Sequence, residues 1–194
     1  ALNVNLFREV VAIPRGEAAY VSIGNKARQF LSRTGRELLA SFSLSEDAHF
    51  KELRPVVEFF IGQFKEETID TLEVLYPRFK NTLVQEPTLI PILPLANLRE
   101  FVYAQLEGEG IEPVRDSREL LYEPAPQVIL EALLDRFVKR EVYQMLVDAR
   151  ASEHSARMVA MKAATDNAKK LTDSLTLQYN KARQAGITQE ILEI

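Results

Sequence analysis

The chain lacks several residue types and patterns that would point to particular classes of protein. It has no cysteine, so it cannot form a disulfide, a thiolate zinc site or a cysteine nucleophile. No apolar run approaches the roughly 18 residues typical of a membrane-spanning helix, and any membrane association is therefore expected to go through partners. The net charge is −4, without the basic excess of a nucleic-acid binder.

Glycine-rich phosphate loops are also missing. The sequence contains neither G-x-G-x-x-G nor G-x-x-x-x-G-K-[ST]. Gly24-Asn25-Lys26 lies between a predicted strand and a predicted helix, where free backbone N–H groups could meet an anion. One glycine is a weak signal, and a plain strand-to-helix turn is the favoured interpretation.

Catalytic and metal-binding patterns are equally scarce. His49 lies three residues before Glu52, but a metal site needs further ligands, and His154 stands alone in a predicted helix. Surface structural roles are expected for both histidines. No serine lies in a G-x-S-x-G turn. The sequence predicts no catalytic residue, no metal site and no cofactor.

Helix and strand patterns alternate over the first two thirds of the chain, which predicts an open α/β sheet in a head comprising residues 1–125. Ser45, Glu46 and Asp47 are expected to cap a helix with Pro55 in its first turn and an apolar face packed on the sheet. Prolines confine residues 89–95 to a sheet edge, and residues 96–123 read as a loop. The predicted helices cover residues 2–13, 26–33 and 45–64, and the predicted strands cover 18–23, 38–44, 72–79, 82–84 and 120–122.

The last third predicts one long helix over residues 126–194. Between Gln127 and Ala185 there is neither proline nor glycine, and good helix formers dominate. Such a helix would be about 100 Å long at ~1.5 Å per residue. The expected ion pairs on its surface are Asp135 with Lys139 and Glu153 with Arg157. The helix is therefore expected to project far beyond the head.

Apolar and small residues recur along this helix with the spacing of a coiled-coil seam. Alanine at a seam buries little area but allows a second helix to approach closely. We therefore expect a partner helix. Because the chain starts at Ala1 rather than at methionine, an upstream segment is the natural candidate. The seam residues are Val142, Met145, Ala149, Ser152, Ala156, Val159 and Ala163.

Three stretches of this helix carry a specific resemblance. Residues 151–168 read ASEHSARMVAMKAATDNA, and residues 179–185 and 187–191 read YNKARQA and ITQEI. They resemble the C-terminal signature of gamma subunits of F-type ATP synthases. Weaker matches cover the rest of the chain: residues 1–3, 5–7, 22–24, 82–94 and 121–124. Ile-Thr-Gln-Glu looks more like the bacterial form.

The resemblance implies a Rossmann-like head and an antiparallel coiled coil of the C-terminal helix with an N-terminal helix that would precede Ala1. It implies a non-catalytic rotor subunit for ATP synthesis and proton transport, which turns inside a ring of alpha and beta subunits. Other implied partners are the epsilon subunit and the membrane rotor ring. The implied location is the cytoplasmic face of the bacterial inner or plasma membrane, as a peripheral part of the complex.

The resemblance also implies which residues contact the beta subunit. They are Arg157, Arg183, Gln184, Thr188, Gln189 and Glu190. A purely local pairing with Glu153 is an equally good interpretation of Arg157. Arg183 and Gln184 have no acidic residue three or four positions earlier to pair with in the helix, so they are the better candidates for this contact. Two other functions stay open, a coiled-coil scaffold unrelated to rotation and a nucleotide-binding α/β enzyme.

Overall fold

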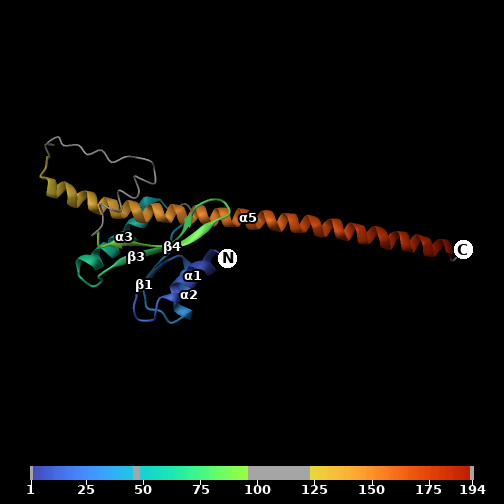
Figure 1. Cartoon of the computed structure of the whole chain (residues 1–194), viewed down its shortest axis with the longest axis horizontal. Helices are drawn as coiled ribbons and strands as arrows, with labels where there is room; N and C mark the ends of the chain where they lie inside the picture. Colours follow the sequence, from blue (N-terminus) through green and yellow to red (C-terminus); the bar gives the residue numbers. More distant parts are fainter. Residues whose placement is uncertain (1, 46–48, 96–122, 193–194) are drawn as a thin grey trace.

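The computed structural model describes residues 2–45, 49–95 and 123–192. A head of short helices and strands gathers around one end of a long helix that extends far beyond it (Figure 1). The elements in chain order are α1 Leu2–Ala12, β1 Tyr20–Ile23, α2 Asn25–Arg33, β2 Leu38–Phe42, α3 Phe50–Lys65, β3 Leu72–Phe79, β4 Gln85–Leu93 and α5 Pro126–Leu192.

The described strands form two separate two-stranded sheets, where the sequence suggested one open sheet. Strands β1 and β2 pair in parallel, and strands β3 and β4 pair antiparallel. The parallel pair is joined by α2, as a parallel connection requires. Helix α1 lies against this unit through Phe7, whose ring stacks on Phe30 at 4.0 Å. The α/β head followed by one long helix is confirmed, with its strands divided.

Helix α3 begins later than the sequence suggested. Its N-cap is His49, and Pro55 is the sixth helical residue, in the second turn rather than the first. The Glu52 carboxylate accepts a hydrogen bond from the His49 backbone N–H at 3.4 Å and another from the Ser45 hydroxyl at 3.1 Å. This return of the third helical side chain to the cap fixes the start of the helix. The predicted first-turn acids Glu46 and Asp47 lie outside the described residues.

The predicted strand at residues 82–84 is wrong. These residues form the turn between β3 and β4, and strand β4 starts at Gln85. The Asn81 side-chain oxygen accepts hydrogen bonds from the backbone N–H groups of Leu83 and Val84, both at 2.9 Å. An asparagine that bonds the following backbone in this way closes a turn and prevents strand pairing. The predicted loop at 96–123 and the short strand at 120–122 fall almost entirely outside the described residues.

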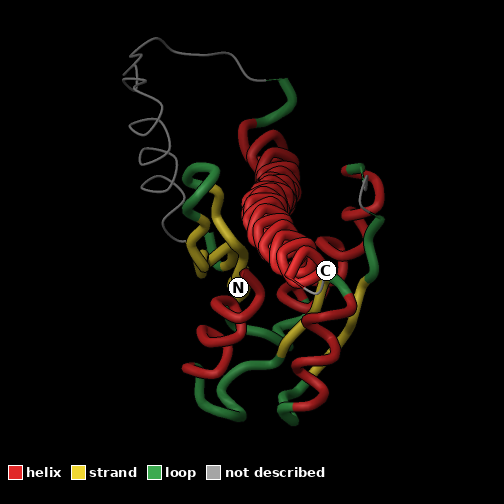
Figure 2. The backbone as a smooth tube through the Cα atoms, turned by 90° about the vertical axis from the view of Figure 1, so that its right-hand side faces the viewer, coloured by secondary structure: helices red, strands yellow, loops and turns green. Residues whose placement is uncertain are grey.

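One apolar core joins the β3–β4 sheet, α3 and the first part of α5. Leu53, Val56 and Val57 of α3 are fully buried. Helix α3 therefore does pack toward a sheet, as its apolar face predicted, but it shares the core with α5. Figure 2, viewed nearly along α5, shows head elements around that helix. The remaining core residues are Leu72, Tyr76, Ile92, Leu93, Val138, Val142 and Met145.

Candidate functional site

Two sections of helix α5 have different surroundings, and we call them the docked section (residues 137–155) and the free section (residues 156–192); the first turns, residues 126–136, precede both. In the docked section Val138, Val142 and Met145 are buried in the head core. Among the described side chains of the free section, only Ala156, Val159 and Asn180 are even half-buried. The functional residues suggested by the sequence all lie in the free section.

The expectation that the whole seam needs a partner helix is wrong for the docked section. Val142, Met145, Ala149 and Ser152, the first four seam residues, lie against the head, where strand β3 runs beside α5. Small side chains let a strand come close to the helix just as they would let a second helix do so. A partner helix is left to cover only the seam from Ala156 onward.

Polar contacts reinforce the packing of the docked section against the head, which we call the joint. The Lys139 ammonium lies 2.6 Å from Asp135 on the same helix and 3.6 Å from Glu58 on α3. The Arg150 guanidinium donates to the Ser45 backbone carbonyl at 2.6 Å. The hydrogen bond from Arg54 and its positive charge lower the pKa of the Glu58 carboxyl. The predicted pair of Asp135 and Lys139 is confirmed, and it extends to α3.

Arg157 stands at the start of the free section with its side chain half exposed. Its guanidinium donates to the Glu153 carboxylate at 2.7 Å, which confirms the predicted local pair. Arg157 also takes part in a further interaction, so its pairing is not limited to Glu153. A contact with another subunit would therefore have to compete with an existing ion pair.

The remaining predicted contact residues lie near the C-terminal end of α5. Arg183 and Gln184 are exposed, and the Thr188 hydroxyl donates to the Gln184 backbone carbonyl at 2.9 Å. Gln189 is exposed and has an interaction of its own. Glu190 lies on the helix, and its side chain is outside the described part.

Arg157 and the terminal residues are far apart along one straight rod. Arg157 precedes Arg183 by 26 residues, or about 39 Å at ~1.5 Å per residue. Figure 1 shows no bend that would bring them together. The structure therefore separates the predicted residues into two levels, one beside the head and one at the tip of the rod.

The strand-to-helix turn at Gly24 is not organised as an anion site. The Gly24 backbone N–H donates to the Phe42 carbonyl at 2.8 Å, so this group is already used within the fold. The Arg28 guanidinium donates to the Asn25 side-chain oxygen at 2.8 Å. The positive φ of Gly24, 98°, explains why glycine stands here. The turn interpretation is therefore the better one.

Other starting points for chemistry are weak in the described part of the chain. His49 caps α3 and His154 is exposed. No group of acidic or histidine side chains among the described residues could hold a metal ion. No described helix is both long and apolar enough to cross a membrane. Burial raises the pKa of the Tyr76 phenol, and Asp148 adds to this effect.

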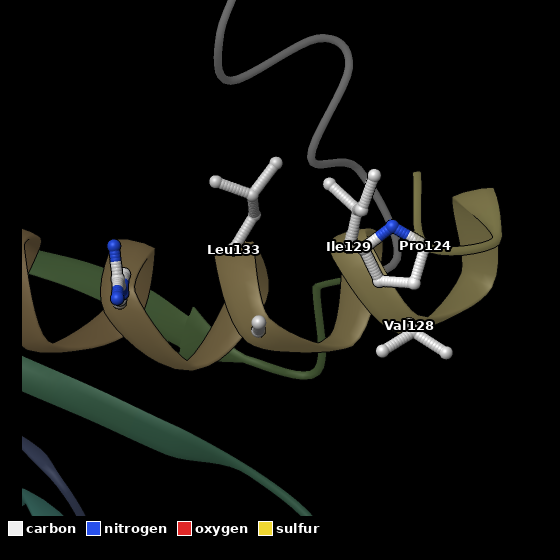
Figure 3. A pocket seen from close by; sticks show the side chains of 6 residues that line it. Pro124, Val128, Ile129 and Leu133 are labelled. Atoms are coloured by element: carbon white, nitrogen blue, oxygen red, sulfur yellow. The ribbon is translucent and has the colours of Figure 1, made fainter. Parts of the chain in front are cut away.

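A shallow hollow of about 270 Å³ lies at the first turns of α5. Its lining is mainly apolar, with Pro124, Ile129 and Leu133 on one side in Figure 3. Val128 and Leu133 are more than half exposed. The hollow holds no convergent polar groups of the kind that orient a small-molecule ligand.

Sequence reasoning gave no special role to two serines of the docked section. Ser152 is completely buried and Ser155 is 8% exposed, and both donate to carbonyls of the head. For Ser152, the signal that could have found it is a serine at an apolar seam position. A hydroxyl buried at such a position needs a partner.

Comparisons with known proteins agree with this architecture. A family model described as ATP synthase matches residues 1–194. The ATP synthase gamma chain of Opitutus terrae is 53% identical over the whole chain, and that of Akkermansia muciniphila is 39% identical. The chain spans about two thirds of these relatives, 66% and 67% of their lengths.

A solved structure shares the fold. The central stalk and c-ring of the Tetrahymena thermophila mitochondrial ATP synthase contains a chain that matches with a TM-score of 0.60 and 23% identity. The match covers 84% of this chain and 69% of that one. The match to the family model over all residues and the identity to gamma chains lead to one conclusion: the chain belongs to the ATP synthase gamma-chain family.

Proposed function

We propose that this chain is the head and rod of a central-stalk rotor subunit, which transmits torque between an ion-driven membrane rotor and a catalytic ring of alpha and beta subunits. The observation that carries the proposal is α5, a single helix of 67 residues that is docked on the head over residues 137–155 and has mostly exposed side chains beyond residue 156. A bare rod of this length can reach into a neighbouring assembly while the head stays outside.

The proposed role is mechanical. In this proposal the chain serves ATP synthesis as a non-catalytic subunit. An asymmetric rod presents different side chains to each beta subunit as it turns. It would thereby shift each subunit between states of different nucleotide affinity, which is a population shift driven by differential contacts.

The proposed division of the chain follows this role. Residues 1–125 form the head, which faces the epsilon subunit and the membrane rotor ring. Residues 126–194 form the rod, whose free section pairs with an N-terminal helix of the complete subunit in an antiparallel coiled coil. The complex would hold the subunit at the cytoplasmic face of a bacterial inner or plasma membrane.

The proposed contacts with the beta subunit are Arg157, Arg183, Gln184, Thr188, Gln189 and Glu190. Arg183 and Gln184 are the strongest candidates because both are exposed at the tip of the rod and neither has an acidic residue three or four positions earlier. None of the ion pairs between described residues involves Arg183. Its charge is therefore available for another subunit without breaking a salt bridge within the rod.

The test is the double change of Arg183 and Gln184 to alanine in the full-length subunit, assembled with the alpha and beta subunits. Coupled ATP turnover is expected to fall. The matched control changes Arg33 and Gln29 to alanine, because these exposed residues of α2 have the same side-chain types but lie on the head. Equal turnover in the two double variants would remove the proposed role of the rod tip.

Two other functions make different predictions. A coiled-coil scaffold unrelated to rotation would co-purify with proteins other than the alpha and beta subunits. A nucleotide-binding enzyme would bind ATP or NAD in calorimetry at micromolar concentration. The use of the Gly24 N–H inside the fold disfavours the second of these functions.

A further inference from the structure

The joint between rod and head contains two hydrogen bonds that differ in kind from the other hydroxyl contacts of α5. The Ser152 hydroxyl donates to the Pro77 carbonyl of β3 at 2.8 Å. The Ser155 hydroxyl donates to the Thr82 carbonyl, in the turn after β3, at 2.9 Å. Both bonds connect residues more than seventy positions apart, and both leave the rod for the β3–β4 hairpin.

Threonine hydroxyls of the free section behave in the ordinary way. Thr165, Thr172 and Thr176 each donate to the carbonyl four residues earlier in the same helix. Such back-bonding is the usual local choice for a hydroxyl in a helix interior. Ser152 and Ser155 make tertiary bonds instead, so their hydroxyls tie α5 to a second element.

The register of β3 and β4 explains why the Pro77 carbonyl is available to a donor from α5. Pro77 lies directly opposite Pro87 in the β3–β4 pair. Opposed residues of an antiparallel pair exchange both of their N–H···O bonds or neither. Since neither proline has an N–H, the Pro77 carbonyl receives no donor from this pair. The buried hydroxyl of Ser152 satisfies it.

Two attachment points on one helix face define a position more strictly than one. Ser152 and Ser155 are three residues apart, which places them on the same face and about 4.5 Å apart along the axis at ~1.5 Å per residue. Their partners occupy the end of β3 and the following turn. A slide of α5 along its axis, or a turn about it, would break both bonds.

We propose that Ser152 and Ser155 are positioning residues, which fix the axial position and rotational setting of α5 on the β3–β4 hairpin so that torque passes between head and rod. This inference rests on the proposed rotor function. Apolar contacts of Val142 and Met145 hold the rod against the head but are not directional. The two hydroxyls supply the directional part of the joint.

The test uses the full-length subunit in ATP synthase reconstituted into lipid vesicles. The variants are Ser152→Ala, Ser155→Ala and the double variant. Ser174→Ala is the matched control, because Ser174 is an exposed serine of the free section. Three measurements are made on each: ATP hydrolysis rate, ions pumped per ATP hydrolysed, and hydrogen exchange of the β3–β4 hairpin.

In the double variant we expect lower pumping per ATP with hydrolysis retained. Amide exchange in the hairpin should be faster by about tenfold, because a buried carbonyl loses its donor. Ser155→Thr keeps a hydroxyl and should keep the normal pumping ratio. The Ser174→Ala control should match the unmodified complex in all three measurements.

Several results would overturn the inference. Faster hairpin exchange with an unchanged pumping ratio would show that the bonds only stabilise the fold. A loss of pumping in Ser155→Thr equal to that in Ser155→Ala would show that the hydroxyl is not what matters. If Ser152→Ala fails to assemble, Ser155→Ala and Ser155→Thr still test the inference. The Thr82 carbonyl keeps a donor in both, because it also accepts a hydrogen bond from the Gln85 side chain at 3.1 Å, so these variants are expected to fold.

Failure of the proposed function has a separate signature. An unmodified complex whose hydrolysis and pumping do not depend on this subunit would remove the rotor function itself. The hydrogen-exchange result would still report on the joint in that case, because it depends only on the fold.

Discussion

The docked and free sections of α5 belong to one continuous helix but follow different rules. In the docked section, Val142, Met145 and Ser152 contact the head and are buried. In the free section the two methionines and Ser174 are exposed, and its threonines bond to their own helix. The difference shows that the residue type does not decide burial along a long helix; what lies beside the helix decides it.

The largest expected difference between the two sections comes from a pair of methionines. Met145 is 4% exposed and Met161 is 65% exposed. Met145→Ala should lower the free energy of unfolding by about 2–5 kcal/mol, because it leaves a cavity in the head core. Met161→Ala should change it by no more than about 0.5 kcal/mol. Urea unfolding of both variants measures the contrast, and equal effects would contradict the division of the helix.

Serines sharpen the same comparison with a smaller effect. Ser152→Ala should cost about 1–3 kcal/mol of unfolding free energy, because the Pro77 carbonyl stays buried without a donor. Ser174→Ala, in the free section, should be neutral or slightly stabilising, since alanine is the better helix former. The readout is again the urea midpoint. A neutral Ser152→Ala would mean that water or another donor replaces the hydroxyl.

A glycine tests whether the tip of the rod depends on helix propensity alone. Gly186 has nothing within 4 Å of the position that a Cβ would take. Gly186→Ala should therefore strengthen the tip by roughly 0.5–1 kcal/mol, through the lower chain entropy of alanine. Slower hydrogen exchange around residues 180–190, with no change in the urea midpoint of the head, is the expected result. Faster exchange there would indicate a contact that alanine disrupts.

The negative charge of Glu58, which lies beside Arg54 and Lys139, gives the smallest expected effect on stability. The folded-state pKa of Glu58 is lowered, chiefly by its hydrogen bond to Arg54. Its contribution to stability is therefore present above the unfolded pKa and is lost as the pH falls through the folded pKa. The difference in stability between the unmodified chain and Glu58→Gln should shrink through this acid range. A difference that stays constant from neutral to acid pH would exclude the carboxylate as its source.

The sequence predicted the long helix well because its signal is local. The absence of proline and glycine over 59 residues, from Gln127 to Ala185, leaves a helix as the natural conformation. Strand β3 was predicted with its observed bounds, Leu72–Phe79. The pairs of Asp135 with Lys139 and Glu153 with Arg157 follow directly from helical spacing.

What the sequence could not predict depends on distant neighbours. The turn at residues 82–84 looked like a strand because Leu83 and Val84 are apolar, yet the Asn81 side chain closes it. The first half of the α5 seam was assigned to a partner helix, because periodicity reports an apolar face and not its occupant. Ser152 looked like an ordinary small seam residue until the opposed prolines of the hairpin supplied its acceptor. The predicted contacts with the beta subunit stay predictions, since they need the partner to be tested.

The prolines of the β3–β4 hairpin also disfavour strand pairing between the heads of two copies. Pro87 and Pro91 lie four residues apart on β4, so both backbone nitrogens point to the same side of the strand. Because a proline is tolerated only where its nitrogen faces away from the ladder, this is the side away from β3, where the strand lacks both donors. A stray β-strand would find few partners there, which is how edge prolines prevent sheet-to-sheet growth. In the part of the head that the structure describes, this border therefore resists strand addition by another copy.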